Sequence, residues 1–120
     1  MKTNEAFEPP AFSDGGAYST VMDLLKFDLA VQNSTLLTEE YTKLWLKPQS
    51  GPFAYGPALI SAERSVCGKD IYGGMGSIPG ASASFNHISE DNYTVIILSN
   101  YDQIGVQIFP KIESALYGED

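Results

Sequence analysis

The sequence predicts an α+β fold in which helices flank an antiparallel sheet of about three or four strands. Two segments with helical apolar spacing come first, a series of strand-like segments follows, and another helical segment comes last. Strands that follow one another through short turns pair antiparallel, and helices gathered before and after them are typical of the α+β class.

The first helical segment is predicted to run from Ser19 or Thr20 to about Gln32. Either hydroxyl can accept a hydrogen bond from a first-turn backbone N–H, so we interpret it as a helix cap and not as a nucleophile. Apolar residues then recur at helical spacing along one stripe, which comprises Val21, Leu24, Leu25 and Leu29. We expect this stripe to face the core.

A second helix is predicted to begin after Thr38 and to end before Pro48. Two acidic residues lie in its first turn, where the helix dipole favours them. Its expected buried face comprises Tyr41, Leu44 and Trp45.

The last helix is predicted to open at Tyr101 and to reach about Tyr117. Apolar residues spaced four apart form one line along it: Ile104, Ile108, Ile112 and Leu116. Pro110 should kink or restart this helix, because proline lacks the N–H of the helical hydrogen bond.

Strand-like segments occupy the middle of the chain. The aromatic and apolar run Pro52–Ile60 predicts a strand, and Ser82–His87 alternates polar and apolar residues, which predicts a half-buried one. Glu90–Asn92 has the composition of a hairpin turn. Tyr93–Leu98 is almost entirely apolar and β-prone, which predicts a central strand buried on both faces.

The 120 residues suffice for one domain, which we divide into an extended leader at 1–17 and a folded unit at 18–120. Fifteen acidic against seven basic residues give a net charge of −8, which repels phosphate backbones, so we expect no nucleic-acid partner. No apolar run approaches the ~18 residues that span a bilayer, so no membrane partner is expected. The first residues lack the apolar segment of a signal peptide.

The chain has a single cysteine, Cys67, and a single histidine, His87. Cys67 has no cysteine partner for a disulfide or a metal site, and we interpret it as a small apolar core residue. His87 is interpreted as a hydrogen-bonded packing residue in preference to a catalytic base, since the sequence suggests no Ser–His–Asp arrangement. We predict neither a cofactor nor a metal ion.

Three segments in this order carry a resemblance to a known family. They are Asp14-Gly-Gly-Ala-Tyr-Ser-Thr with its helix, Tyr72-Gly-Gly-Met-Gly-Ser-Ile-Pro-Gly, and the strand Asn92-Tyr-Thr-Val-Ile-Ile-Leu-Ser-Asn. Over about residues 13–118 the chain resembles the C-terminal half of the β-lactamase-related serine hydrolases, which include penicillin-binding-protein-like enzymes. The resemblance implies a partial β-lactamase/transpeptidase-like fold, with 18–120 as the C-terminal half of such a domain.

The family's nucleophile motif is missing from this sequence. These enzymes use a Ser-x-x-Lys in which the lysine lies one helical turn from the serine and takes its proton. No lysine here has a serine three positions before it. A second element of these enzymes, Tyr-x-Asn or Ser-x-Asn, supplies another proton carrier. Ser84-Phe-Asn86 has the residue types of this motif, but it follows the third-strand segment, which the motif precedes in the family. We interpret Ser84 and Asn86 as the polar face of a strand.

The family's substrate-binding strand is present in altered form. Counted back from Pro79-Gly80, its His-x-Gly position falls on Gly74, Met75 and Gly76. Gly74 replaces the basic residue, and Gly76 matches the family glycine. The resemblance implies that these residues line the substrate cleft through their backbone, and the alternative is that the glycines form a turn or bulge beside the sheet edge.

The resemblance also bears on partners. In this family the sheet begins with two N-terminal strands, and the first of them pairs with the last strand, so the 93–99 strand is expected to have lost a neighbour. An unpaired apolar edge is a template for another chain. We therefore expect pairing with an N-terminal half of the same fold or self-association through this edge.

Three functions follow from these expectations. The first is the C-terminal fragment of a serine hydrolase acting on β-lactams, D-Ala-D-Ala peptides or esters, which is inactive alone without the nucleophile. The second is a non-catalytic binding module, and the third is an oligomerisation domain. Localisation is left open, because full-length relatives are often periplasmic or exported whereas this sequence shows no signal peptide.

Overall fold

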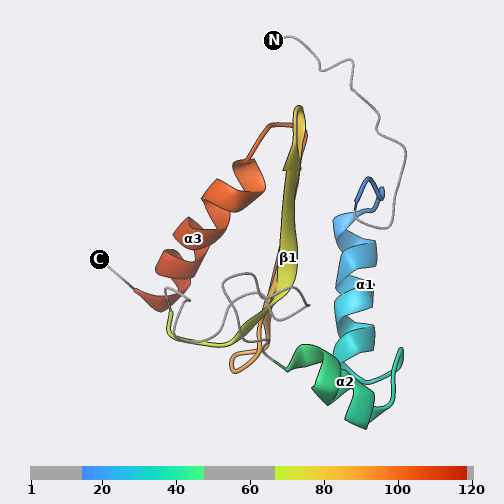
Figure 1. Ribbon diagram of the computed structural model, residues 1–120. Coiled ribbons are helices and arrows are strands. Elements are labelled where there is room, and N and C mark those ends of the chain that lie inside the picture. Colours follow the sequence, from blue (N-terminus) through green and yellow to red (C-terminus); the bar gives the residue numbers. More distant parts are fainter. Residues whose placement is uncertain (1–14, 48–66, 119–120) are drawn as a thin grey trace.

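The computed structural model describes residues 15–47 and 67–118 (Figure 1). Its elements are, in order, α1 (Val21–Gln32), α2 (Glu39–Leu46), β1 (Ile71–Ile78), β2 (Ala81–Ile88), β3 (Tyr93–Ser99) and α3 (Ile104–Tyr117). The predicted leader, apart from its last three residues, and the predicted Pro52–Ile60 strand lie outside the described residues.

The three strands form one antiparallel sheet in the order β1-β2-β3, which confirms the predicted α+β class. β1 pairs with β2 from Ile71 opposite Ile88 to Ile78 opposite Ala81. β2 continues into β3 through the predicted hairpin turn at residues 89–92. Among the described strands β2 is therefore the central one.

The prediction that Tyr93–Leu98 is a central strand is wrong for the described part of the chain. β3 lies at an edge of this sheet, and its side chains are half-buried or exposed. An apolar run indicates that both faces of a strand are covered. It does not indicate whether the backbone of that strand pairs with one neighbouring strand or with two.

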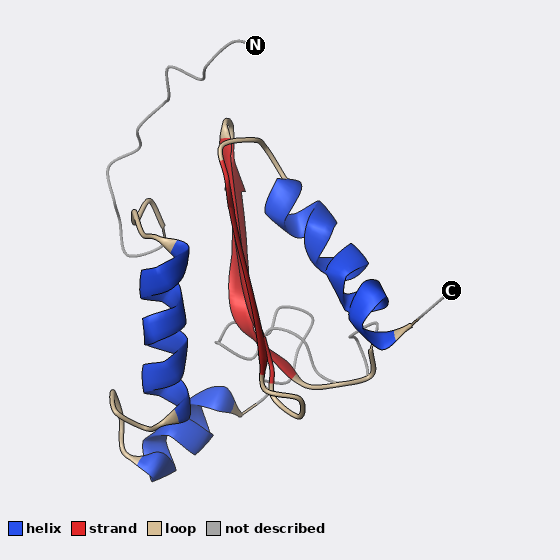
Figure 2. Cartoon of the chain, turned by 180° about the vertical axis from the view of Figure 1, so that it is seen from behind, coloured by secondary structure: helices blue, strands red, loops and turns tan. Residues whose placement is uncertain are grey.

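Helices cover both faces of the sheet. Figure 2 shows the strands edge-on, with α1 and α2 on one side and α3 on the other. Each side has a small core: Val31 of α1 packs with Tyr72 and Phe85 on the first, and Phe109 of α3 packs with Ile71 and Ile88 on the second. Successive side chains of each strand contribute to the two cores in turn, as the pleat requires.

The polar side chains of β2 lie on a buried face and not on an exposed one. Ser82, Ser84 and Asn86 are all buried in this three-layer arrangement. The Ser82 hydroxyl donates to the Tyr101 carbonyl (2.9 Å) and accepts from the Gly105 N–H (3.1 Å), which ties β2 to the start of α3. The predicted half-buried strand is thus covered on both sides, because α3 packs on the face that carries the short hydroxyl side chains.

Helix α1 has the predicted bounds but a different buried face. Thr20 caps it by accepting from the Asp23 N–H (3.1 Å), as the sequence predicts. Val21 and Leu29 of the predicted stripe are 44% and 46% exposed, and the buried residues are Asp28 and Val31. Leu24 and Leu25 of the stripe are half-buried, so the buried face is shifted toward Asp28 and Val31, because a polar contact described below holds Asp28 against the sheet.

The other helices differ from prediction in a similar way. The expected buried face of α2 is exposed, Tyr41 and Leu44 most of all, and its one buried residue is Thr42. α3 is one continuous helix that includes Pro110, so it does not restart there. Gly105, Phe109 and Glu113 form its buried line, one position on from the predicted isoleucine line.

One glycine of β1 is required by the strand pairing itself. Gly73 has φ 151°, and a Cβ added to it would clash with the Phe85 carbonyl oxygen of β2. A larger residue at this position would force the two strands apart or change the backbone conformation. A Cβ added to Gly76, on the same strand, would meet no heavy atom of the described residues within 4 Å beyond its own chain neighbours.

Gly73→Ala is expected to destabilise the protein by about 2–3 kcal/mol, because the added methyl group meets backbone and not a flexible side chain. Gly76→Ala is the matched control and should change stability by less than about 1 kcal/mol. Urea unfolding of both variants beside the unchanged chain measures the difference. Equal stability of the two variants would contradict the conformation described for Gly73.

Candidate functional site

A buried carboxylate joins α1 to all three strands. Asp28 is 0% exposed and accepts hydrogen bonds from the Tyr72 hydroxyl (2.6 Å) on β1 and the Thr94 hydroxyl (2.5 Å) on β3. Gln32, one turn along α1, donates to it through Nε2 (2.7 Å), and His87 Nδ1 on β2 lies 3.1 Å from it. We call Asp28, Gln32, Tyr72, His87 and Thr94 the polar cluster.

The cluster holds the His87 imidazole rigidly. Its ring stacks on Tyr72 with centroids 4.6 Å apart, and Nδ1 also lies 3.1 Å from the Thr94 hydroxyl and 3.3 Å from Gln32 Nε2. His87 is thus buried and hydrogen-bonded, as the packing interpretation predicts. The members of the cluster come from four different elements, so the sequence does not indicate which residues contact His87. Its one signal is an acidic residue, Asp28, inside an apolar helix.

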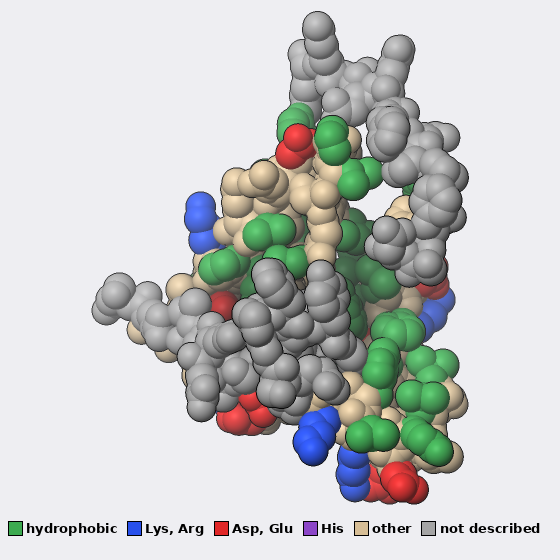
Figure 3. Space-filling model, in the orientation of Figure 1, with side chains coloured by type: hydrophobic (Ala, Val, Ile, Leu, Met, Phe, Trp, Pro, Cys, Tyr) green, Lys and Arg blue, Asp and Glu red, His purple; other side chains and the backbone are tan. Residues whose placement is uncertain are grey.

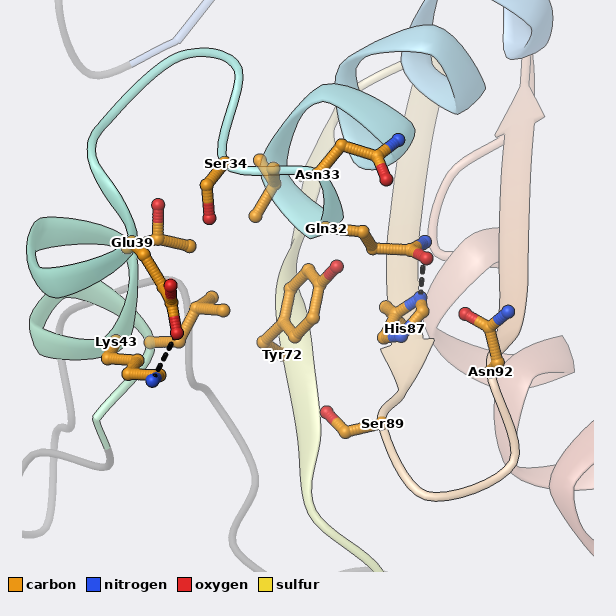
Figure 4. A pocket seen from close by; sticks show the side chains of 12 residues that line it. Gln32, Asn33, Ser34, Glu39, Lys43, Tyr72, His87, Ser89 and Asn92 are labelled. Carbon is orange, nitrogen blue, oxygen red and sulfur yellow. Dashed lines mark hydrogen bonds and ion pairs between the residues drawn. The ribbon is translucent and has the colours of Figure 1, made fainter.

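A pocket of about 590 Å³ opens beside the cluster, between the C-terminal end of α1, α2 and the end of the sheet near the β2–β3 turn (Figure 4). Its lining comprises Val31, Gln32, Asn33, Ser34, Glu39, Thr42, Lys43, Leu46, Tyr72, His87, Ser89 and Asn92. Sequence reasoning did not predict this pocket.

The predicted substrate-binding residues Gly74, Met75 and Gly76 lie elsewhere, in the middle of β1. They pair in regular register with Phe85, Ser84 and Ala83 of β2, so they form a strand and not a turn or bulge. The Met75 side chain is 45% exposed. None of the three lines the pocket, although Tyr72, two residues earlier on the same strand, does.

The other residues considered in the sequence occupy structural positions. Ser84 and Asn86 are buried under α3, where Asn86 Nδ2 donates to the Ser84 hydroxyl (2.5 Å). Cys67 is half-buried, and its backbone N–H donates to the buried Glu113 carboxylate (2.8 Å). In the described ranges no three His, Cys, Asp or Glu side chains are grouped so as to hold a metal ion, and no helix is long and apolar enough to cross a bilayer.

A solved structure matches this arrangement. It is the penicillin binding protein from Bacillus halodurans. The alignment covers 86% of the present chain, with a TM-score of 0.65 and 26% sequence identity. The chain has a penicillin-binding-protein-like fold. The match is partial, because the chain covers 33% of the length of that protein. No family model matches the sequence, and neither does any curated protein.

Within this penicillin-binding-protein-like fold the polar cluster perturbs one ionisable group strongly. Burial, followed by the hydrogen bond to the Asp28 carboxylate and its charge, raises the pKa of the Tyr72 hydroxyl well above its usual value. Each effect disfavours a phenolate next to a buried carboxylate. The hydroxyl therefore stays a donor to Asp28 across the physiological pH range.

Tyr72 makes stability depend on pH in the alkaline range. A group whose pKa is raised on folding stabilises the protein below its unfolded pKa, which for tyrosine is about 10, and this contribution is lost as pH rises above that value. We expect the free energy of unfolding, measured with urea between neutral and strongly alkaline pH, to fall above this point. Tyr72→Phe should be less stable by about 1–2 kcal/mol at neutral pH and should show a shallower alkaline fall.

The control for this prediction is Tyr18→Phe, since the Tyr18 side chain is 79% exposed. Tyr18→Phe should follow the curve of the unchanged chain throughout. Parallel alkaline curves for Tyr72→Phe and the unchanged chain would contradict the buried hydrogen bond to Asp28.

Proposed function

We propose that these residues form the C-terminal part of the catalytic domain of a penicillin-binding-protein-like serine hydrolase, acting on β-lactams, D-Ala-D-Ala peptides or esters. In this proposal Gly74, Met75 and Gly76 form one wall of the substrate cleft. The nucleophile comes from outside these residues, so the chain is inactive alone. The observation that carries the proposal is the partial match to a penicillin binding protein over most of this chain.

The position of the glycine segment supports the role of cleft wall. β1 is an outer strand, with β2 as its one partner among the described strands. The packing of the described residues does not demand a glycine at residue 76, since a Cβ there meets none of their atoms within 4 Å. A strand edge without side chains lets a substrate approach the backbone closely. Gly74 in place of a basic residue argues for substrates whose recognition at this point needs no cation.

Three serines of the sheet support inactivity of the chain alone. Ser82 and Ser84 are buried under α3, with hydroxyls that bond to backbone groups and to Asn86. Ser77 donates to the Ala81 carbonyl (3.5 Å) and accepts from the Gln103 N–H (3.0 Å). The sequence also contains no Ser-x-x-Lys. The Ser77 and Ser82 hydroxyls connect secondary-structure elements and the Ser84 hydroxyl bonds within β2, and none of these three has a hydrogen bond to a basic side chain among the described residues.

Exposed apolar surface supports a missing portion of the fold. Figure 3 shows hydrophobic side chains gathered over α2 and the loop before it. The large apolar side chains exposed on α1, α2 and their connection are Val21, Met22, Phe27, Leu29, Leu36, Leu37, Tyr41, Leu44 and Trp45. An exposed apolar patch like the one over α2 (Figure 3) marks an interaction site. Its occupant in this proposal is the N-terminal part of the same fold.

A labelling experiment tests the proposal. The chain, shown to be folded by circular dichroism, is exposed to a fluorescent penicillin and to a fluorophosphonate, and its intact mass is measured. We expect no adduct, because a serine becomes a nucleophile only beside a base and the Ser-x-x-Lys motif is absent. The Bacillus halodurans penicillin binding protein is the positive control for the penicillin. A stoichiometric adduct on this chain would show that a reactive serine lies within these residues.

The alternative, an oligomerisation module, is favoured by the outer edge of β3. No described strand pairs with this edge, and the apolar Tyr93 and Leu98 side chains at its two ends are exposed. Such an edge can pair with the same edge of a second copy.

Leu98→Lys tests the alternative, because a lysine on an edge strand disfavours pairing with another strand. Sedimentation of the unchanged chain should show association at high concentration, and Leu98→Lys should weaken it by about tenfold or more. Leu116→Lys adds the same charge on α3, at a side chain of similar exposure, and should leave association unchanged. A chain that stays monomeric at high concentration would exclude the oligomerisation module.

A further inference from the structure

The polar cluster engages one nitrogen of His87 and not the other. Asp28 and Thr94 offer oxygen atoms to Nδ1 at 3.1 Å each, whereas Gln32 Nε2, a donor 3.3 Å from Nδ1, makes its shorter hydrogen bond to Asp28 (2.7 Å). Thr94 donates its hydroxyl proton to Asp28, so its oxygen can accept from a protonated Nδ1, and Asp28 accepts as a carboxylate. This arrangement favours the tautomer with hydrogen on Nδ1, which leaves the lone pair of Nε2 as an acceptor.

Nε2 has no hydrogen-bond partner among the described residues, although His87 is only 3% exposed. Among the described residues the one fully buried side-chain atom without a partner is Asn86 Oδ1, so Nε2 keeps some contact with solvent and can take a partner from water or from a ligand. The residue lines the pocket, and in Figure 4 its ring lies between Tyr72 and Asn92. The pocket is therefore the side from which a partner for Nε2 arrives.

Further hydrogen-bonding groups line the same pocket. The side chains of Asn33, Ser34, Ser89 and Asn92 make no hydrogen bonds to the described part of the chain and remain available to a ligand. Val31 and Leu46 supply apolar lining beside them. The volume lies within the range of about 300–1,000 Å³ that is usual for small-molecule sites.

The described lining offers no unpaired charge. Lys43 and Glu39 neutralise each other in an ion pair of 2.5 Å, drawn as a dashed line in Figure 4. Asp28 lies behind His87, buried and saturated with donors. A charged ligand would lose its hydration without gaining a counter-charge, so the pocket favours a neutral one.

We propose that this pocket binds a neutral sugar, with a ligand hydroxyl donating to His87 Nε2 and the surrounding amide and hydroxyl side chains bonding to the others. Sugars combine many hydroxyl groups with apolar C–H faces, which matches the mixture of polar side chains with Val31 and Leu46. The site is separate from Gly74, Met75 and Gly76, so the proposal does not depend on the hydrolase function.

The single histidine of the chain makes the test direct. Nitrogen NMR of the imidazole in the ¹⁵N-labelled chain resolves Nε2 from Nδ1 without assignment of other residues. The probes are glucose, glucuronate and glucosamine, which share a ring but are neutral, negative and positive. We expect glucose to shift the Nε2 resonance saturably, with an affinity about tenfold or more above that of either charged analogue.

Two substitutions provide the matched controls. Asn33→Ala removes a pocket side chain at an exposed position and should weaken glucose binding by about threefold or more. Asn100→Ala makes the same change at an exposed residue just after β3, at the other end of that strand from Asn92, and should have no effect. Absence of a saturable shift with glucose up to high millimolar concentration, or equal shifts with all three probes, would overturn the proposal.

Discussion

The buried carboxylate of Asp28 is the contact on which the arrangement of this chain depends. Moving a carboxylate out of water raises the free energy of the folded protein by roughly several kcal/mol unless hydrogen bonds replace its hydration. Tyr72, Thr94 and Gln32 supply those hydrogen bonds, and His87 completes the set. Because the partners lie on α1 and on every described strand, the requirement to satisfy one charge fixes the distance and the rotation of the helix relative to the sheet.

That rotation accounts for part of the exposed apolar surface. With Asp28 and Val31 turned inward, Leu29, the next residue after Asp28 and so about 100° around the helix, is turned outward. Val21 in the first turn and Tyr41 and Leu44 of α2 are exposed as well. Exposed apolar patches of this kind mark interaction sites. In the function proposed above, this surface and the edge of β3, which no described strand pairs with, are the places where the N-terminal part of the fold would pack.

The two candidate sites of the chain differ in how they are built. The Gly74–Gly76 strand offers backbone and little else, so any chemistry there depends on groups brought by another part of the fold. The pocket beside His87 is lined by side chains of the chain itself, three of which, Gln32, Tyr72 and His87, the polar cluster holds in place. A chain without the Ser-x-x-Lys motif can therefore still carry a preorganised site.

The sequence by itself determined the local features. Thr20 and Thr38 cap helices where expected, the hairpin turn after β2 forms as predicted, and the ordered glycine-rich motifs indicated the family resemblance. These depend on interactions between residues close in the chain. Tertiary structure alone decided which helix faces are buried, that β2 and not β3 is central among the described strands, and that Asp28 meets His87. Those outcomes depend on contacts between residues far apart in the sequence, such as Asp28 and Thr94, which are 66 positions apart. Apolar periodicity also gives no indication of a buried charge.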